Sequence, residues 1–247
     1  VDGRLDGRRV QVAGVDGRAV STTLDAAALR LDLSGTSPRW SLSGPARVRM
    51  DRAAAEAFTG QGITLETARL EAGGQEGRFE VTGPWSVSAN RLSSGDLVLT
   101  NTSGRVDLDL ISDAGLTLAG RLEARGGRWP LLGQPAADDV PELAAMKAAL
   151  GDFSLVAPAF TYRSGSGGGR LDLTQAAVLR PRSGGALTIA PTSAPVLSLR
   201  DGQAPGGQFR VTATRGGGLP EADLAIPRWS LEPGGFSADF NGRAALD

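Results

Sequence analysis

The feature that most constrains the fold is a short phrase that recurs along the chain: a glycine, usually an arginine, and then apolar residues at every second position. Clear copies begin at Gly77, Gly104, Gly120, Gly169 and Gly207. Because successive side chains of a strand point to opposite faces, each copy predicts a strand with one apolar and one polar face. Repeated strands without intervening helices exclude a doubly wound α/β fold. They leave a sandwich, a solenoid or one long curved antiparallel sheet.

The inventory of reactive side chains is small. The 247 residues include no His, no Cys, a single Tyr and a single Lys, Lys147. Thiolate nucleophiles, imidazole or thiolate metal sites and Ser-His-Asp triads are therefore excluded. The carboxylate pairs Asp107/Asp109 and Asp138/Asp139 are explained by the polar face of a strand and by a helix cap. We predict no catalytic residue, no metal site, no cofactor and no enzymatic activity.

The charge pattern and the hydropathy limit the classes of partner that the chain is expected to bind. The 26 basic and 27 acidic residues are mixed along the chain, so the electrostatic footprint of a nucleic-acid-binding protein is missing and we expect no nucleic-acid partner. The chain opens without Met and contains no signal peptide and no apolar run of about 18 residues. We therefore expect an internal segment of a larger protein.

Two helices are expected within the strand pattern. Asp139, Pro141 and Glu142 resemble a capping box with proline in the first turn, which predicts a helix near 139–150. Asp51 predicts a cap for a short helix near 52–58. We divide the chain into a β-groove segment over 1–134, a helical insertion over 135–152 and a second β-groove segment over 153–247, within one continuous architecture.

Glycine and proline are expected to separate short strands. They divide Arg39–Ser43 from Ala46–Met50, and Gly77–Thr82 from Trp85–Ser88. Trp40, Trp85 and Trp229 each follow a proline closely, which predicts packing at the margin of a sheet.

The apolar face contains unusually few aromatic side chains. The chain has 4 Trp, 7 Phe and 1 Tyr against 35 Gly and 14 Pro, so Leu, Val and Ala form most of this face. About 15 or more strands with one substantial helix leave it largely uncovered, and soluble monomers rarely expose such patches without a ligand. An alkyl chain is the natural ligand for a wall of small aliphatic side chains. The residues predicted to line this groove are Val106, Leu108, Leu110, Leu116, Leu118, Leu171, Leu173, Leu187, Ile189, Leu197, Leu199, Phe209, Val211, Leu224 and Ile226.

The chain resembles the AsmA-like, bridge-like lipid transfer proteins of Gram-negative envelopes, and within them the YdbH-like intermembrane phospholipid transport proteins of alphaproteobacterial type. The repeated strands carry the general resemblance. A more specific part runs from Trp129-Pro130-Leu131-Leu132-Gly133 through Asp138-Asp139-Val140-Pro141-Glu142-Leu143 to Met146–Phe153 and Ala157-Pro158-Ala159-Phe160.

This resemblance implies a taco-shaped, mainly antiparallel β-groove that carries glycerophospholipids across the periplasm between the inner and outer membranes. It also implies a parent protein anchored in the inner membrane, with partners at both membranes. Phospholipid acyl chains are the expected ligand. The alternative is a structural or adhesive β-solenoid or sandwich domain of an envelope or surface protein, and a glycan-active enzyme on a β-solenoid ranks third.

Overall fold

The described residues form one open antiparallel sheet of 16 strands. The computed structural model describes residues 2–12, 15–34, 37–55, 58–94, 96–112, 115–130, 134–137, 139, 141–165, 168–192, 197–198, 208–232 and 235–245. The all-β fold, predicted from the alternation, is confirmed, and of the three arrangements that the alternation left, the structure has the one long curved antiparallel sheet.

Strand order follows chain order along most of the sheet, β1-β2-β4-β5-β6-β7-β8-β9-β11-β12-β14-β15-β16, while β3 pairs with β4, β10 pairs with β9, and β13 pairs with β10. The strands are β1 (Gly3–Val12), β2 (Val15–Leu24), β3 (Ala28–Asp32), β4 (Arg39–Ala55), β5 (Phe58–Gln75), β6 (Arg78–Ser94), β7 (Leu97–Ile111), β8 (Gly115–Arg128), β9 (Phe153–Gly165), β10 (Gly168–Leu173), β11 (Ala177–Pro181), β12 (Ala186–Pro191), β13 (Leu197–Ser198), β14 (Phe209–Thr214), β15 (Glu221–Glu232) and β16 (Gly235–Ala245).

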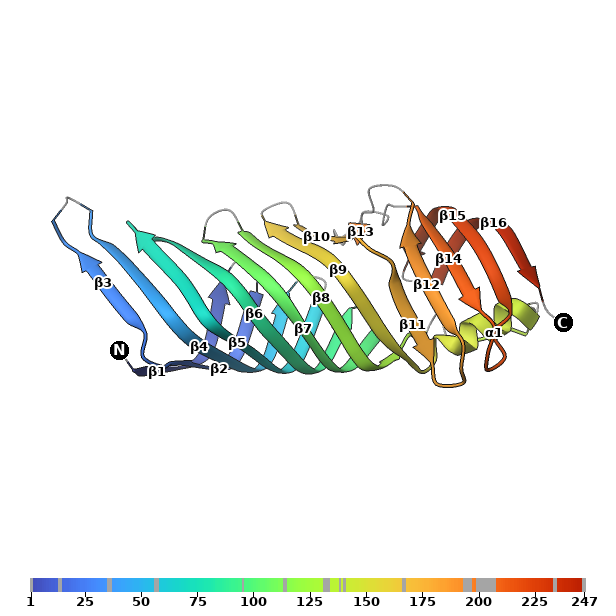
Figure 1. The fold of residues 1–247 in the computed structure, drawn as a ribbon, viewed down its shortest axis with the longest axis horizontal. Coiled ribbons are helices and arrows are strands. Elements are labelled where there is room, and N and C mark those ends of the chain that lie inside the picture. Colours follow the sequence, from blue (N-terminus) through green and yellow to red (C-terminus); the bar gives the residue numbers. More distant parts are fainter. Residues whose placement is uncertain are drawn as a thin grey trace.

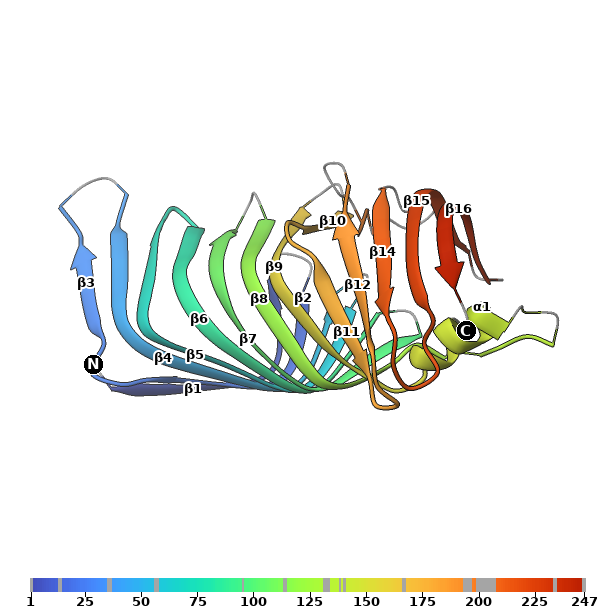
Figure 2. The same cartoon turned by 45° about the vertical axis from the view of Figure 1, so that its right-hand side comes forward.

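The sheet is bent about its long axis into a trough, and the two chain ends lie at opposite ends of that axis (Figure 1). Its long strands run down one side, through the bottom and toward the opposite side, most visibly in β4 to β8 (Figure 2). The strands therefore cross the trough rather than run along it. Each successive hairpin therefore increases the length of the trough.

Several predicted strands are longer than expected. β4 runs through Gly44 and Pro45, and β6 runs through Gly83 and Pro84, so the predicted breaks at these positions are wrong. The register between β4 and β5 shifts between Gly44 and Ala46, so Pro45 lies where the ladder already needs no amide donor. Trp85 lies in the middle of β6 with 5% of its surface exposed, and its predicted position at a sheet margin is also wrong.

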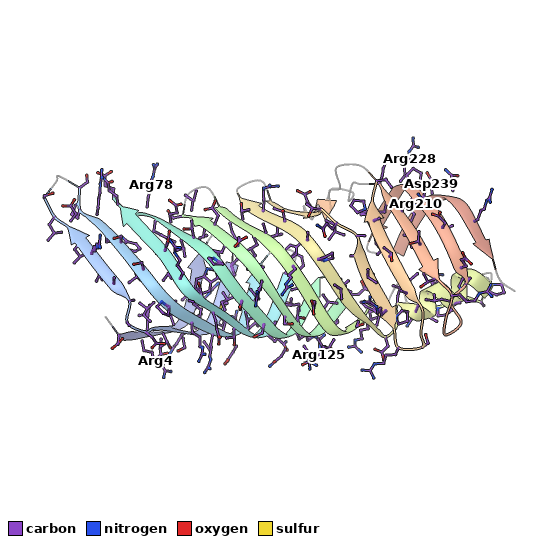
Figure 3. The ribbon with its side chains drawn as sticks, viewed as in Figure 1. Arg4, Arg78, Arg125, Arg210, Arg228 and Asp239 are labelled. Atoms are coloured by element: carbon purple, nitrogen blue, oxygen red, sulfur yellow. The ribbon has the colours of Figure 1, made fainter. Side chains whose placement is uncertain are left out.

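A line of skipped pairs crosses seven neighbouring strands. In every strand pair from β1 to β8 along the main order of the sheet, the ladder skips one residue on each strand, and the skipped residues lie side by side across the sheet. From β1 to β8 they are Arg8, Ala19, Asp51, Gly62, Asn90, Asn101 and Arg125. Ala19, Gly62 and Asn101 have φ values of 50°, 59° and 50°. We call this line the crease. A positive φ departs from the extended β conformation and interrupts the ladder locally, and Arg125 projects from the underside of the trough (Figure 3).

The crease explains why the predicted helix near 52–58 is wrong. Residues 52–55 continue β4 and Phe58 begins β5, while 56–57 lie outside the described residues. At the crease, side chains on the same face of the sheet are three residues apart instead of two. Met50 and Ala53 on β4 belong to one hydrophobic cluster, and they pair with Ile63 and Gly60 on β5. A three-residue step in an Ala-rich segment mimics a helix. Pairing with β2 and β5 on both sides overrides the weak helical propensity.

Gly62 supplies a stability test of the crease. A Cβ at position 62 would lie 2.3 Å from Nδ2 of Asn90, whereas a Cβ at Gly77, φ 80°, would meet nothing within 4 Å. The left-handed backbone alone costs an L-residue about 1–2 kcal/mol. We expect Gly62→Ala to lower the free energy of unfolding by more than Gly77→Ala does, as measured by urea denaturation. Equal losses would mean that the crease tolerates side chains as an ordinary turn does.

The predicted helix near 139–150 is confirmed as α1 (Pro141–Ala149). It belongs to an excursion between β8 and β9, residues 129–151, that we call the arm. The sheet is continuous across the arm because β8 pairs with β9. The ends of the arm meet where the Trp129 amide donates to the Leu150 carbonyl at 2.8 Å.

An ion pair within the arm predicts acid sensitivity. The Lys147 ammonium donates to both oxygens of Asp139 at 2.7 and 2.8 Å, and this bond, with the Ala136 amide, holds the pKa of Asp139 below its ordinary 3.8. Because the folded pKa is lowered, the stabilisation is complete above pH 3.8 and is lost as the pH falls through the folded pKa. We expect Asp139→Asn to speed hydrogen exchange of the α1 amides at about pH 7 and to have little effect at about pH 2. An equal effect at both pH values would contradict this role.

Candidate functional site

The predicted lining residues with described backbones lie on one face of the sheet. Leu108 pairs with Leu118, and Leu118 pairs with Tyr162 on β9, which in turn pairs with Leu171. Directly paired residues of an antiparallel sheet point to the same side. We call this the inner face and the opposite side the outer face.

The same face continues into the C-terminal strands. Leu155 of β9 pairs with Leu179, Leu179 with Leu187, and Leu187 with Ala213. Ile189 pairs with Val211, Val211 with Leu224, and Phe209 with Ile226. Leu199 lies outside the described residues, and only the backbones of Leu171 and Leu197 are described. A single apolar surface therefore joins residues that are 120 positions apart in the chain.

The inner face is the concave face of the trough. Val106 pairs with Trp85, and both are buried with Leu70 and Ala46 in one cluster. Around them lie half-buried aliphatic side chains, among them Leu108 and Leu118. Curvature crowds side chains on the concave side, so a single-layer sheet buries them without a second sheet above it.

The prediction missed the N-terminal part of this face. Rows of paired residues extend it to the edge strands, as in Leu5-Thr22-Val48-Leu65-Val87 and Leu29-Leu42-Ala72-Val81-Leu110. The alternation Arg47-Val48-Arg49-Met50 carried the signal for these positions. Toward the N-terminal edge the inner face opens, and Leu5 and Leu31 are 71% and 64% exposed.

The outer face is charged. Exposed arginines pair with carboxylates on the same or the neighbouring strand, as in Arg47–Glu66 and Arg9–Asp16 at 2.7 and 2.8 Å. Arg4 and Arg125 project from the underside, and Arg78 and Arg228 from the upper rim (Figure 3). Exposed pairs of this kind add little stability. Their charged groups keep the convex surface hydrated.

The carboxylates show no catalytic arrangement within the described residues. Asp107 and Asp109 are exposed on the outer face of β7, Asp139 binds Lys147, and Asp138 lies outside the described residues. A shallow hollow of about 360 Å³ on the outer face is lined by Glu66, Arg105 and Asp107 among others, and Glu66 there already pairs with Arg47. In the described part of the chain no three His, Cys, Asp or Glu side chains gather as a metal site would require.

Two buried polar groups lie on the inner face. Trp85 Nε1 and Thr102 Oγ1 have no hydrogen-bond partner among the described residues. Thr102 pairs with Ala89, in the same face as Trp85. Both are covered by neighbouring side chains, so they add no polar group to the accessible lining.

The chain matches no protein-family model, no curated protein and no solved structure. Among the described residues, no helix has both the length and the apolar character that crossing a bilayer demands.

Proposed function

We propose that this chain is a non-enzymatic segment of a lipid-transfer conduit that carries glycerophospholipids along its inner face. The observation that carries the proposal is the apolar inner face of an open trough, on which the described side chains carry no charge. All described strands belong to one sheet, so no second sheet covers this face as it would in a sandwich. The part of this face that stays accessible, from the exposed Leu5 and Leu31 to the half-buried Leu108 and Leu118, is an apolar surface that calls for a ligand.

The energetics favour acyl chains as that ligand. Moving a two-chain lipid through water exposes about 30 methylenes at about 0.8 kcal/mol each, a barrier above about 20 kcal/mol. An apolar trough removes most of that barrier. Because the lining is mainly Leu, Val and Ala, contact energy varies little with position. A chain can then slide without a deep minimum.

The charged outer face is consistent with a conduit that is surrounded by water. A lipid whose acyl chains lie in the trough keeps its headgroup in water above the rim, so the protein needs no headgroup pocket. We propose a periplasmic location between the inner and outer membranes, with partners at both ends of the parent protein. Direction and energy come from those partners, since a uniform wall only equilibrates its two ends.

Lipid transfer between vesicles tests the proposal. Donor vesicles carry a fluorescent phospholipid with a quencher, and dequenching on addition of the chain and acceptor vesicles reports transfer. We expect a rate proportional to chain concentration, together with strong binding of a hydrophobic dye by delipidated chain. A chain that neither transfers lipid nor binds the dye would contradict the proposal and favour a structural or adhesive role.

A further inference from the structure

Arginines gather in a line on the convex side of the sheet. Next to the crease, a row of directly paired residues crosses the strands from β1 to β6 and holds four arginines and no carboxylate. Its members are Arg9, Arg18, Arg52, Gln61 and Arg91. In the adjoining crease lie Arg8 on β1 and Arg125 on β8, which projects from the underside of the trough (Figure 3). We call these six arginines the arginine line: Arg8, Arg9, Arg18, Arg52, Arg91 and Arg125.

The crease explains why these side chains are crowded. The inner face of β4 steps by three residues there, so the two residues of the step, Asp51 and Arg52, are both exposed. On β1 the equivalent two residues are Arg8 and Arg9, which are also exposed. One skipped residue in each strand therefore gives the convex side a second row of side chains beside the first. Asp51 is the one carboxylate among the skipped residues.

Most charges of the line have no counter-ion. Arg9 pairs with Asp16 at 2.8 Å. By contrast, Arg18, Arg52 and Arg91 form no ion pair with any carboxylate that the structure describes. Arg18 lies directly opposite both Arg9 and Arg52, and like charges directly opposite each other on neighbouring strands are destabilising. An anionic partner that lies over the line would relieve this repulsion.

The shape and the composition of the line favour a flat anionic partner. The line follows successive strands, so it runs along the long axis of the trough on its convex side (Figures 1 and 3). A convex ridge meets a flat surface along a line, whereas a nucleic-acid duplex is read by elements that enter its grooves. The other residues of the crease and of the row are Ala, Asp, Gln, Gly, Asn and Thr. The line therefore lacks both the apolar and aromatic anchors of protein interfaces and the stacking rings of single-strand binders.

We propose that the arginine line docks this chain on the surface of an anionic phospholipid membrane. Guanidinium groups bind phosphate oxygens in a bidentate geometry, and each arginine near an anionic bilayer adds to the attraction. The long axis of the trough then lies in the plane of the membrane, and the inner face opens toward water. The inference goes beyond lipid carriage, because it holds whatever the inner face binds.

Vesicle sedimentation with the purified chain tests the docking. The probes are vesicles of phosphatidylcholine alone and of equimolar phosphatidylcholine and phosphatidylglycerol, at about 0.1 M and about 0.5 M salt. We expect the chain to bind the anionic vesicles at least tenfold more tightly at the lower salt concentration and to lose this preference at the higher one. Equal binding to both kinds of vesicle would overturn the docking. Tighter binding to a duplex oligonucleotide than to the anionic vesicles would also overturn it, because the partner would then be a nucleic acid.

Two double variants locate the contact. Arg18→Gln with Arg52→Gln removes two arginines of the line, and we expect the affinity for anionic vesicles to fall at least tenfold. The urea midpoint of this variant should stay or rise, because a like-charge pair is lost. Arg30→Gln with Arg39→Gln is the matched control, which removes the same charge from exposed positions of β3 and the start of β4. Equal losses of affinity in the two double variants would overturn the proposal, because net charge alone would explain them.

Leu108→Glu separates docking from the proposed function. Leu108 lies on the inner face, so this variant should bind anionic vesicles as tightly as the unmodified chain does. Loss of binding in Leu108→Glu would overturn the docking, because the vesicles would then be held through the trough. A chain that docks through the arginine line but transfers no lipid would contradict the proposed function alone.

Discussion

The substitution Leu108→Glu is expected to lower the rate of phospholipid transfer at least tenfold. Leu108 is half-buried on the inner face, between Leu118 of β8 and Gly83 of β6. A carboxylate there would have to lose water whenever an acyl chain passed, and an unpaired charge in apolar surroundings is strongly unfavourable. A tenfold loss requires only about 1.4 kcal/mol. The vesicle transfer assay measures it.

Ser103→Glu is the matched control. Ser103 lies on the same strand, is exposed on the outer face, and gains the same single charge. We expect its transfer rate to stay within about twofold of the unmodified chain, because surface substitutions away from special contacts have small effects. If the two variants transfer lipid equally well, the inner face is not the path.

The substitution Phe153→Ala is expected to cost about 3–5 kcal/mol of stability, the usual cost of emptying a buried ring site. Phe153 opens β9 with 1% of its surface exposed. Its ring lies against Gly127, where a Cβ would come within 2.4 Å of it. The ring joins the sheet to the end of α1, because it shares a buried cluster with Ala149.

Urea unfolding followed by circular dichroism measures this loss. Leu31→Ala is the control, since Leu31 is 64% exposed and should change stability by no more than about 0.5 kcal/mol. Such a loss is a large part of the usual 5–15 kcal/mol total, so the Phe153→Ala variant should unfold at a much lower urea concentration. A cost below about 1 kcal/mol would mean that this cluster is not the core that anchors β9.

The period-two pattern was sufficient to predict the all-β fold and the shared face of residues such as Leu108, Leu173 and Leu224. Alternation fixes which side chains share a face within a strand, and hairpin order carries that face to the next strand. The capping residues around Asp139 were sufficient to predict α1. These features are local, so a sequence displays them directly.

The bends of the sheet could not be predicted in the same way. The crease depends on skipped pairs in seven adjacent strands, and no one of its members, Ala19 or Asn101 for example, is unusual in its own segment. Likewise, Gly44 and Pro45 signal a break locally but sit inside β4 because a register shift accommodates them. The burial of Ala149 in one cluster with Leu187 depends on contacts between distant segments, which periodicity does not encode.

The most direct test of the central claim is mass spectrometry of an organic extract of the chain, purified without detergent after export to the periplasm. The apolar inner face of an open trough should retain its ligand through such a purification. We predict phospholipid at about one molecule or more per chain, enriched over its share of the membrane extract. A monodisperse chain free of lipid would contradict the account, because the inner face would then be stable in water without acyl chains.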